Sequence, residues 1–252
     1  MPSAYNLCMQ QVVVPISGGM DSTVLLHWAC TKYAAVHAIS FDYAQRHRRE
    51  LVFAQDQALI CASKGPAKVT HKTIDISFIR DIAPTSSLTN DAIATPDVRV
   101  IRGEAQPKSY VPNRNMMMLS IATAYAEAQG ATTVWHGAAQ ADSLAGYFDG
   151  DTTFVDAMNA VNALNREHRV IIEAPLINMS KADIVRKGVE LGVDFAKTYT
   201  CYAGGELADA NSASSSLRLQ GFLESGYIDP LKYIQQDQLD RVYAQRGCRP
   251  IN

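Results

Sequence analysis

Short apolar runs alternate with stretches whose apolar residues recur at helical spacing, as far as about residue 191. The apolar runs predict buried strands, and the spaced stretches predict amphipathic helices. The predicted strands are 11–16, 35–41, 67–74, 132–137 and 170–174, and the predicted helices are 21–33, 48–63, 115–129, 154–165 and 181–191. This alternation favours an α/β fold with a doubly wound, mainly parallel sheet. Such sheets bind ligands beyond the carboxyl ends of their strands.

Two stretches break this pattern. Residues 77–112 carry no periodicity, and loops of that length are usually functional or disordered. Residues 203–215 are rich in Gly, Ala, Ser and Asn, so we expect them to be mobile. The polar tail beyond them has an aromatic cluster at Tyr227, Tyr233 and Tyr243 and predicts a short helical appendage. We therefore divide the chain into an α/β domain over 1–200 and a C-terminal loop and helical appendage over 201–252.

Pro15 lies inside the first predicted strand. Proline has no N–H to donate to a neighbouring strand. Its presence therefore predicts an edge position, a bulge or the end of the strand.

Composition adds mainly exclusions. The formal net charge is −2, which does not favour nucleic acid or an anionic membrane as a partner. The apolar runs are too short for membrane spans, and no signal peptide is recognisable at the N-terminus. The five cysteines are odd in number and scattered, which argues against a disulfide framework. We expect a cytoplasmic protein.

The strongest chemical signal is the hexapeptide between the first strand and the first helix. Its residues are Ser17, Gly18, Gly19, Met20, Asp21 and Ser22. The glycines allow a sharp turn, and backbone N–H groups at a helix start bind phosphate. Asp21 is itself an anion and suits Mg²⁺ better than phosphate. No Walker lysine is present, so a P-loop kinase or GTPase is excluded. The alternative is a plain tight turn capped by Asp21.

This hexapeptide resembles the SGGxDS signature of the N-type ATP pyrophosphatases. Four further segments resemble the 7-cyano-7-deazaguanine synthase (QueC) family: FDYAQRH at 41–47, YVPNRN at 110–115, GYFD at 146–149, and PLI followed by SKADIV within 175–185. The resemblance spans roughly residues 11–222 and keeps the order of every block. It implies a homodimeric ligase that adenylates 7-carboxy-7-deazaguanine with ATP. Ammonia then gives the amide, and a second adenylation gives the nitrile.

The resemblance also implies roles for individual residues. The expected catalytic residues are Asp21, Arg114 and Lys181, of which Arg114 would contact phosphate or carboxylate. Phe41 and Arg114 would join the hexapeptide in binding ATP. Residues expected to bind the deazaguanine are Tyr43, Gln45, Asn115, Asp142, Tyr147 and Asp149. The alternatives are surface pairing for Arg114 and Lys181, a turn for Asp149 and simple core for Tyr43.

The chain departs from the family at a structural zinc site made of four cysteines. Cys201 matches the first, while the other three positions hold Asp209, Ser212 and Ser215. One thiolate and one carboxylate cannot close a tetrahedral structural site, so we predict that zinc is absent. Without zinc, the loop should be less ordered or held by another contact.

These departures keep other functions open. Gly150 also replaces a cysteine of the relatives. The chain could be a paralogue that stops at the amide or transfers the deazaguanine to another acceptor. It could also be a non-catalytic ATP-binding protein. A tRNA-thiolating enzyme is less favoured, because its cysteine pair and RNA-binding appendage are not visible.

Overall fold

The computed structural model describes residues 10–44, 49–90, 92–93, 109–144, 147–199, 207–211 and 213–251. Its centre is a five-stranded sheet in the order β3-β2-β1-β4-β5, with every neighbouring pair parallel. The strands are β1 (Gln11–Pro15), β2 (Ala35–Asp42), β3 (Lys68–Asp75), β4 (Thr133–Trp135) and β5 (Ile171–Glu173). All five predicted strands are present, and the predicted α/β class is confirmed.

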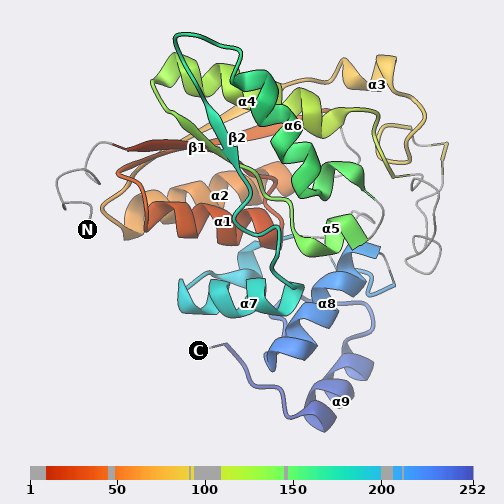
Figure 1. Cartoon of the computed structure of the whole chain (residues 1–252). Helices are drawn as coiled ribbons and strands as arrows, with labels where there is room; N and C mark the ends of the chain where they lie inside the picture. Colours follow the sequence, from red (N-terminus) through yellow and green to blue (C-terminus); the bar gives the residue numbers. More distant parts are fainter. Residues whose placement is uncertain are drawn as a thin grey trace.

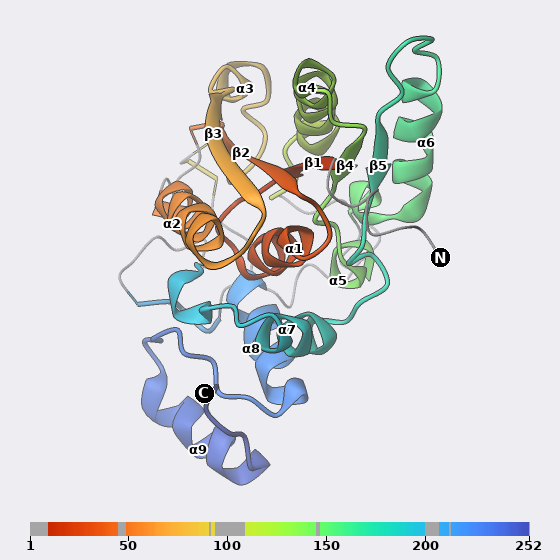
Figure 2. The same cartoon turned by 90° about the vertical axis from the view of Figure 1, so that its left-hand side faces the viewer.

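Helices cover both faces of the sheet. On one face lie α1 (Met20–Cys30) and α2 (Arg49–Lys64), and on the other lie α4 (Arg114–Gln129) and α6 (Thr152–Asn162) (Figures 1 and 2). The remaining helical elements are α3 (Ile79–Ile82), α5 (Gln140–Leu144), η3 (Phe148–Gly150), α7 (Lys181–Glu190), η4 (Phe195–Lys197), α8 (Ala213–Ser225) and α9 (Gln236–Arg246). No helix in the described ranges has both the length and the apolar character needed to cross a bilayer.

The central strand explains why the apolar run that begins the fold does not alternate with polar residues. Val12 and Val14 pack into the core beneath α1, whereas Val13 packs into the core beneath α4. All three are fully buried. A strand covered on both faces needs apolar side chains at every position, so β1 reads as one continuous run.

The structure corrects three details of the sequence prediction. β1 is central rather than an edge strand, and Pro15 is its last residue, so the strand-end alternative holds. The segment 77–112 is not featureless, since it contains α3 and the two turns that follow it. Helix α8 begins at Ala213, inside the segment 203–215 that was expected to be a loop. The rest of that segment is described only over 207–211.

The C-terminal part has a small core of its own, below α7 in Figure 1. Tyr233 and Tyr243 belong to it, as the aromatic pattern predicted. Tyr227 packs against the main core beneath α1 instead. The predicted helical appendage is therefore present, as α9, with α8 preceding it.

A fully buried ion pair lies within this appendage. Arg218 donates from Nε to one oxygen of Asp229 at 2.6 Å and from Nη2 to the other at 2.8 Å. The same guanidinium donates to the Thr198 hydroxyl at 2.6 Å and to the Phe195 carbonyl at 3.1 Å. The Tyr233 hydroxyl donates to Asp229 at 2.7 Å. The pair therefore ties α8 both to the segment after α7 and to the tail.

Candidate active site at the carboxyl ends of the strands

The hexapeptide forms a tight loop between β1 and α1. The Ser17 and Ser22 hydroxyl oxygens lie 3.1 Å apart, and the Ser17 N–H donates to the Ser22 hydroxyl, also at 3.1 Å. Gly19 is the N-cap of α1, and no side chain among the described residues caps this helix. Asp21 lies inside the first turn, so the alternative of a turn capped by Asp21 is wrong. An uncapped helix start directs N–H groups and a positive dipole at an anion.

Gly18 is required by close packing as well as by backbone geometry. Its φ is +81°, and a Cβ there would lie 2.3 Å from the Glu50 carbonyl oxygen and 2.8 Å from the Ala54 nitrogen. On its other side, the Tyr199 N–H donates to the Gly18 carbonyl at 3.0 Å. The loop is thus fixed by α2 and by the segment after α7, which preorganises it for a ligand.

Asp21 and Lys181 form an ion pair across the loop, with 2.7 Å between Oδ2 and Nζ. The other oxygen of Asp21, Oδ1, is buried and has no hydrogen-bond partner in the described part of the chain. Burial opposes the charge on Lys181, but Asp21 and Asp142 outweigh it and raise the pKa of Lys181. The lysine is therefore a fixed positive charge next to the phosphate loop.

Asp142 links this cationic centre to the opposite side of the site. It accepts a hydrogen bond from the Ala139 N–H at 2.8 Å. Burial raises the pKa of Asp142, while Lys181 opposes that rise and Arg114 opposes it to a smaller extent. Asp142 thus interacts electrostatically with both Lys181 and Arg114.

Arg114 begins α4 and reaches the end of β2. Its Nη1 donates to the Tyr43 hydroxyl at 3.3 Å, and its guanidinium carbon lies 5.3 Å from the centre of the Tyr43 ring. Its Nε donates to the Asn115 side-chain oxygen at 3.4 Å. Burial raises the pKa of the Tyr43 hydroxyl, against the opposing charge of Arg114. The Tyr43 ring packs against the core beneath α4, as the core alternative expected, while its hydroxyl accepts from Arg114.

Two strained backbone positions flank this pair. Ala44, with φ +54°, directly follows Tyr43, and Asn113, with φ +53°, directly precedes Arg114. They are the non-glycine residues with positive φ in the described part of the chain. Such positions persist only where their surroundings enforce them, and they concentrate at functional sites. The two strained positions therefore flank Tyr43 and Arg114, the same two residues that the resemblance assigns to substrate and ATP binding.

The segment after α5 completes the site. The Tyr147 hydroxyl lies 2.7 Å from the Ser109 hydroxyl, which fixes the ring. Asp149 lies in η3 with 5% of its surface exposed. Burial raises the pKa of Asp149, opposed first by Arg114 and then by His136. The two carboxylates Asp142 and Asp149 thus approach Arg114 from different segments.

Sequence reasoning missed three residues here. Glu50, in the first turn of α2, has its pKa raised to about 8 by burial, against the opposing charge of Arg114. His136 directly follows β4, and its Nε2 lies 3.4 Å from the Asp149 carbonyl oxygen. Ser109 fixes Tyr147. For His136, the one signal in the sequence is its position at the carboxyl end of a predicted strand, where ligands of such sheets bind.

Other predicted residues contribute differently or lie outside the described ranges. The Phe41 and Met20 side chains are buried in the two cores, so their contact with a ligand would be made by the backbone. Asn115 is an acceptor for Arg114. Gln45 lies outside the described residues.

The region that matches the family's zinc site is described in part. Cys201 and Ser212 lie outside the described residues. Asp209 accepts hydrogen bonds from the Asn211 N–H at 3.0 Å and from the Gln235 side chain at 3.1 Å.

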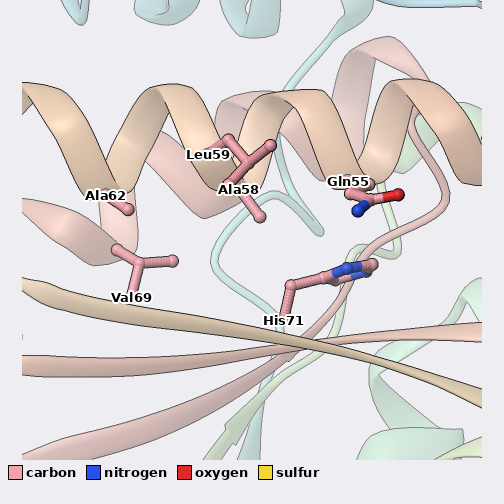
Figure 3. Close-up of a pocket in the computed structure, with 6 residues that line it drawn as sticks. All are labelled: Gln55, Ala58, Leu59, Ala62, Val69 and His71. Carbon is pink, nitrogen blue, oxygen red and sulfur yellow. The ribbon is translucent and has the colours of Figure 1, made fainter.

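A shallow cavity of about 190 Å³ lies elsewhere, between α2 and the edge strand β3 (Figure 3). It is lined by Gln55, Ala58, Leu59, Ala62, Val69 and His71. The His71 ring nitrogen Nε2 is hydrogen-bonded to Ser40 at 2.9 Å. The cavity has no cluster of charged groups, in contrast to the loop region, and we do not assign the site to it.

Comparison with known proteins gives a family and a fold. The family model described as queuosine biosynthesis protein QueC matches residues 11–226. A "7-cyano-7-deazaguanine synthase" of Marinobacter nauticus is 43% identical over 222 residues, covering 88% of this chain and 96% of the relative. One of Alteromonas mediterranea is 41% identical over 224 residues, covering 89% of this chain and 99% of the relative.

Solved structures share the architecture at low identity. An NMN synthetase from Francisella tularensis superposes with a TM-score of 0.51 at 17% identity, over 96% of this chain and 87% of that one. The U34-tRNA thiolase NcsA from Methanococcus maripaludis superposes with a TM-score of 0.50 at 14% identity, over 95% of this chain and 73% of that one. At such identity these likenesses support the fold alone.

Proposed function

The chain belongs to the QueC family of queuosine biosynthesis proteins, and we propose that it is an ATP-dependent carbon–nitrogen ligase that converts 7-carboxy-7-deazaguanine into 7-cyano-7-deazaguanine with ammonia. The observation that carries this proposal is one site in which Asp142 interacts electrostatically with the Asp21–Lys181 ion pair of the phosphate loop and with Arg114 at the start of α4. Relatives named for this activity match almost their whole length. ATP, ammonia and the acid are the small-molecule substrates, and no nucleic acid partner is required.

The first task of the site is to activate a carboxylate. A carboxylate is a poor electrophile, so its oxygen attacks the α-phosphorus of ATP and pyrophosphate leaves. The uncapped start of α1 and the loop N–H groups would hold the phosphates. Lys181 would neutralise charge that develops there, and its neighbours keep it protonated.

The residues at the loop also fit a magnesium ion. The orphaned, buried Oδ1 of Asp21 is the oxygen donor that such an ion prefers. Magnesium, when bound, would neutralise the phosphate oxygens. Asp21 would then face two cations, because Oδ1 would be available to the ion while Oδ2 keeps its ion pair with Lys181.

The second task is to recognise the deazaguanine ring. Its amino group and ring N–H are donors, so buried carboxylates are suitable partners. Asp142 and Asp149 supply two, and Arg114 supplies an opposite charge for the substrate carboxylate. Tyr43 and Tyr147 offer flat rings with fixed hydroxyls. Asn115 orients Arg114, and we keep Gln45 as a proposed substrate contact.

Three further features belong to the proposal. We propose that no zinc is bound, since the donors at Asp209 and Ser215 do not suit it. Cys30, Cys61 and Cys248 are free thiols within the described part, which fits a reducing cytoplasm. We also expect a homodimer, which light scattering would test.

A product assay tests the proposed function. The purified protein is incubated with the acid, ATP and ammonia, and the products are identified by mass. We expect the nitrile, AMP and pyrophosphate, with no turnover when any substrate is omitted. Accumulation of the amide alone would reject nitrile synthesis in favour of an amide-forming paralogue. ATP binding without pyrophosphate release would reject an enzyme of this type.

A further inference from the structure

His136 is a titratable group that the proposed reaction has not yet used. It follows β4 directly, and its backbone N–H donates to the Glu173 carbonyl at 2.7 Å. Val134 belongs to the core beneath α4 and Trp135 to the core beneath α1. Side chains alternate along an extended strand, so His136 lies on the α4 side, where Arg114 begins its helix.

The ring has a defined orientation. Nε2 lies 3.4 Å from the Asp149 carbonyl oxygen. A carbonyl only accepts, so this contact places the ring hydrogen on Nε2 and leaves the lone pair on Nδ1. No described residue hydrogen-bonds to Nδ1. Asp149 interacts electrostatically with both His136 and Arg114, which places the imidazole in the same cluster as the substrate-facing groups.

Burial also favours the neutral form of the ring. Burial lowers the pKa of His136 below its ordinary 6.5, opposed by the backbone oxygen and the charge of Asp149. A neutral imidazole near pH 7 can accept a proton and release it again. Of the other histidines in the described part, His168 is exposed, and the remaining three are hydrogen-bonded elsewhere. Those at 27, 37 and 71 are hydrogen-bonded to Gln57, to Gln11 and Thr70, and to Ser40 respectively.

We propose that Nδ1 of His136 accepts the protons that the substrate nitrogen loses, in both the amide-forming and the nitrile-forming step. This rests on the proposed function. In the first step ammonia forms a C–N bond to the acyl-adenylate, the C–O bond to AMP breaks with its electron pair, and the excess proton passes to His136. In the second step the amide oxygen is adenylated and pyrophosphate leaves. The two N–H protons then leave in turn as the C–O bond to AMP breaks and the nitrile forms.

Separate assays of adenylation and of nitrogen chemistry test this role. Exchange of labelled pyrophosphate into ATP, with the acid present and ammonia absent, reports adenylation alone. Amide and nitrile formation with ammonia report the later steps. We expect His136→Gln to keep exchange within about threefold of the wild type and to slow amide formation by roughly a hundredfold, a usual size for general-base catalysis. Added imidazole should restore part of the loss, and His37→Gln, which changes a ring already hydrogen-bonded to Gln11 and Thr70, should behave as wild type.

The outcomes separate this inference from the function on which it rests. A wild-type enzyme without acid-dependent exchange overturns both. If the wild type exchanges and His136→Gln forms the amide at the wild-type rate, only the role of His136 is overturned. Equal loss of exchange and of amide formation in His136→Gln and in His136→Asn would make the residue structural and would also overturn the inference.

Discussion

The Lys181 ammonium lies 2.7 Å from the Asp21 carboxylate, although 160 residues separate them in sequence. Lys181 is the first residue of α7, and α8 approaches it so closely that a Cβ at Gly221 would lie 2.8 Å from the Lys181 Cβ. The appendage therefore buttresses a residue of the proposed phosphate site. Through this contact we expect the C-terminal unit to help position Lys181 at the carboxyl edge of the sheet.

Lys181→Met tests the importance of this charge. Removing one charged donor to a developing negative charge costs about 10²–10³ in rate, and we expect that loss in kcat for acid-dependent pyrophosphate release. Lys187→Met is the matched control, because Lys187 lies on the same helix and its ammonium contacts the exposed Glu190 and the Trp28 ring rather than Asp21. Retention of kcat within about threefold in Lys181→Met would remove Lys181 from the catalytic set.

Gly18→Ala should damage the loop more than its backbone angle alone implies. The new Cβ would overlap backbone atoms of α2, which cannot move without moving the helix. Overpacking and left-handed strain together should destabilise the protein by about 3 kcal/mol, measured by urea unfolding. Gly192→Ala has a similar φ of +67° and open space around it, so it should cost only about 1 kcal/mol. Equal costs would contradict the packing argument.

The Arg218–Asp229 pair should stabilise the appendage in place of a metal. Arg218→Met leaves a buried carboxylate without its partner, which should cost about 3–5 kcal/mol. The double variant Arg218→Met with Asp229→Asn should recover part of that loss, because no unpaired charge remains. A chelator should leave the melting temperature of the wild type unchanged. A fall in melting temperature on chelation, or stoichiometric zinc in the purified protein, would show that a metal holds the region.

Glu50 predicts a pH dependence of stability. Burial raises its pKa from 4.5 to about 8, so the folded protein holds a proton that the unfolded chain releases above pH 4.5. The contribution of Glu50 to stability is therefore greatest below that pH and falls as pH rises towards 8, by a few kcal/mol at most. Glu50→Gln should remove the Glu50 part of this dependence and be more stable than the wild type at pH 8, while the raised pKa values of Asp142 and Asp149 should leave a remaining dependence of the same sign. Glu167→Gln, at an exposed position, should leave the dependence unchanged. Parallel urea titrations at pH 5 and pH 8 measure both.

The strands and helices whose apolar residues form a continuous run or recur at helical spacing were predictable. Strand β1 is buried on both faces and appears as a continuous run of valines. The phosphate loop was predictable because the turn at Gly18, with φ +81°, needs glycine. Helix α8 was not, since it opens with small residues that resemble a loop, and its stability comes from tertiary contacts such as Arg218.

The site was predictable where residues belong to recognisable segments. The Asp21–Lys181 pair and the approach of Tyr43 to Arg114 join residues that were expected to act together. Glu50 and His136 were missed because their character comes from burial and from neighbours on other elements. A single glutamate or histidine has no pattern that distinguishes such a place from the surface.

The most direct test of the account follows the oxygen atoms of the substrate. The enzyme is given 7-carboxy-7-deazaguanine labelled with oxygen-18 at both carboxylate oxygens, together with ATP and ammonia. Adenylation at the loop requires each oxygen to leave on AMP, so we predict the nitrile with two molecules of singly labelled AMP and unlabelled pyrophosphate. Label in phosphate, or unlabelled AMP with the acid unchanged, would contradict the claim that this loop directs ATP at a deazaguanine carboxylate.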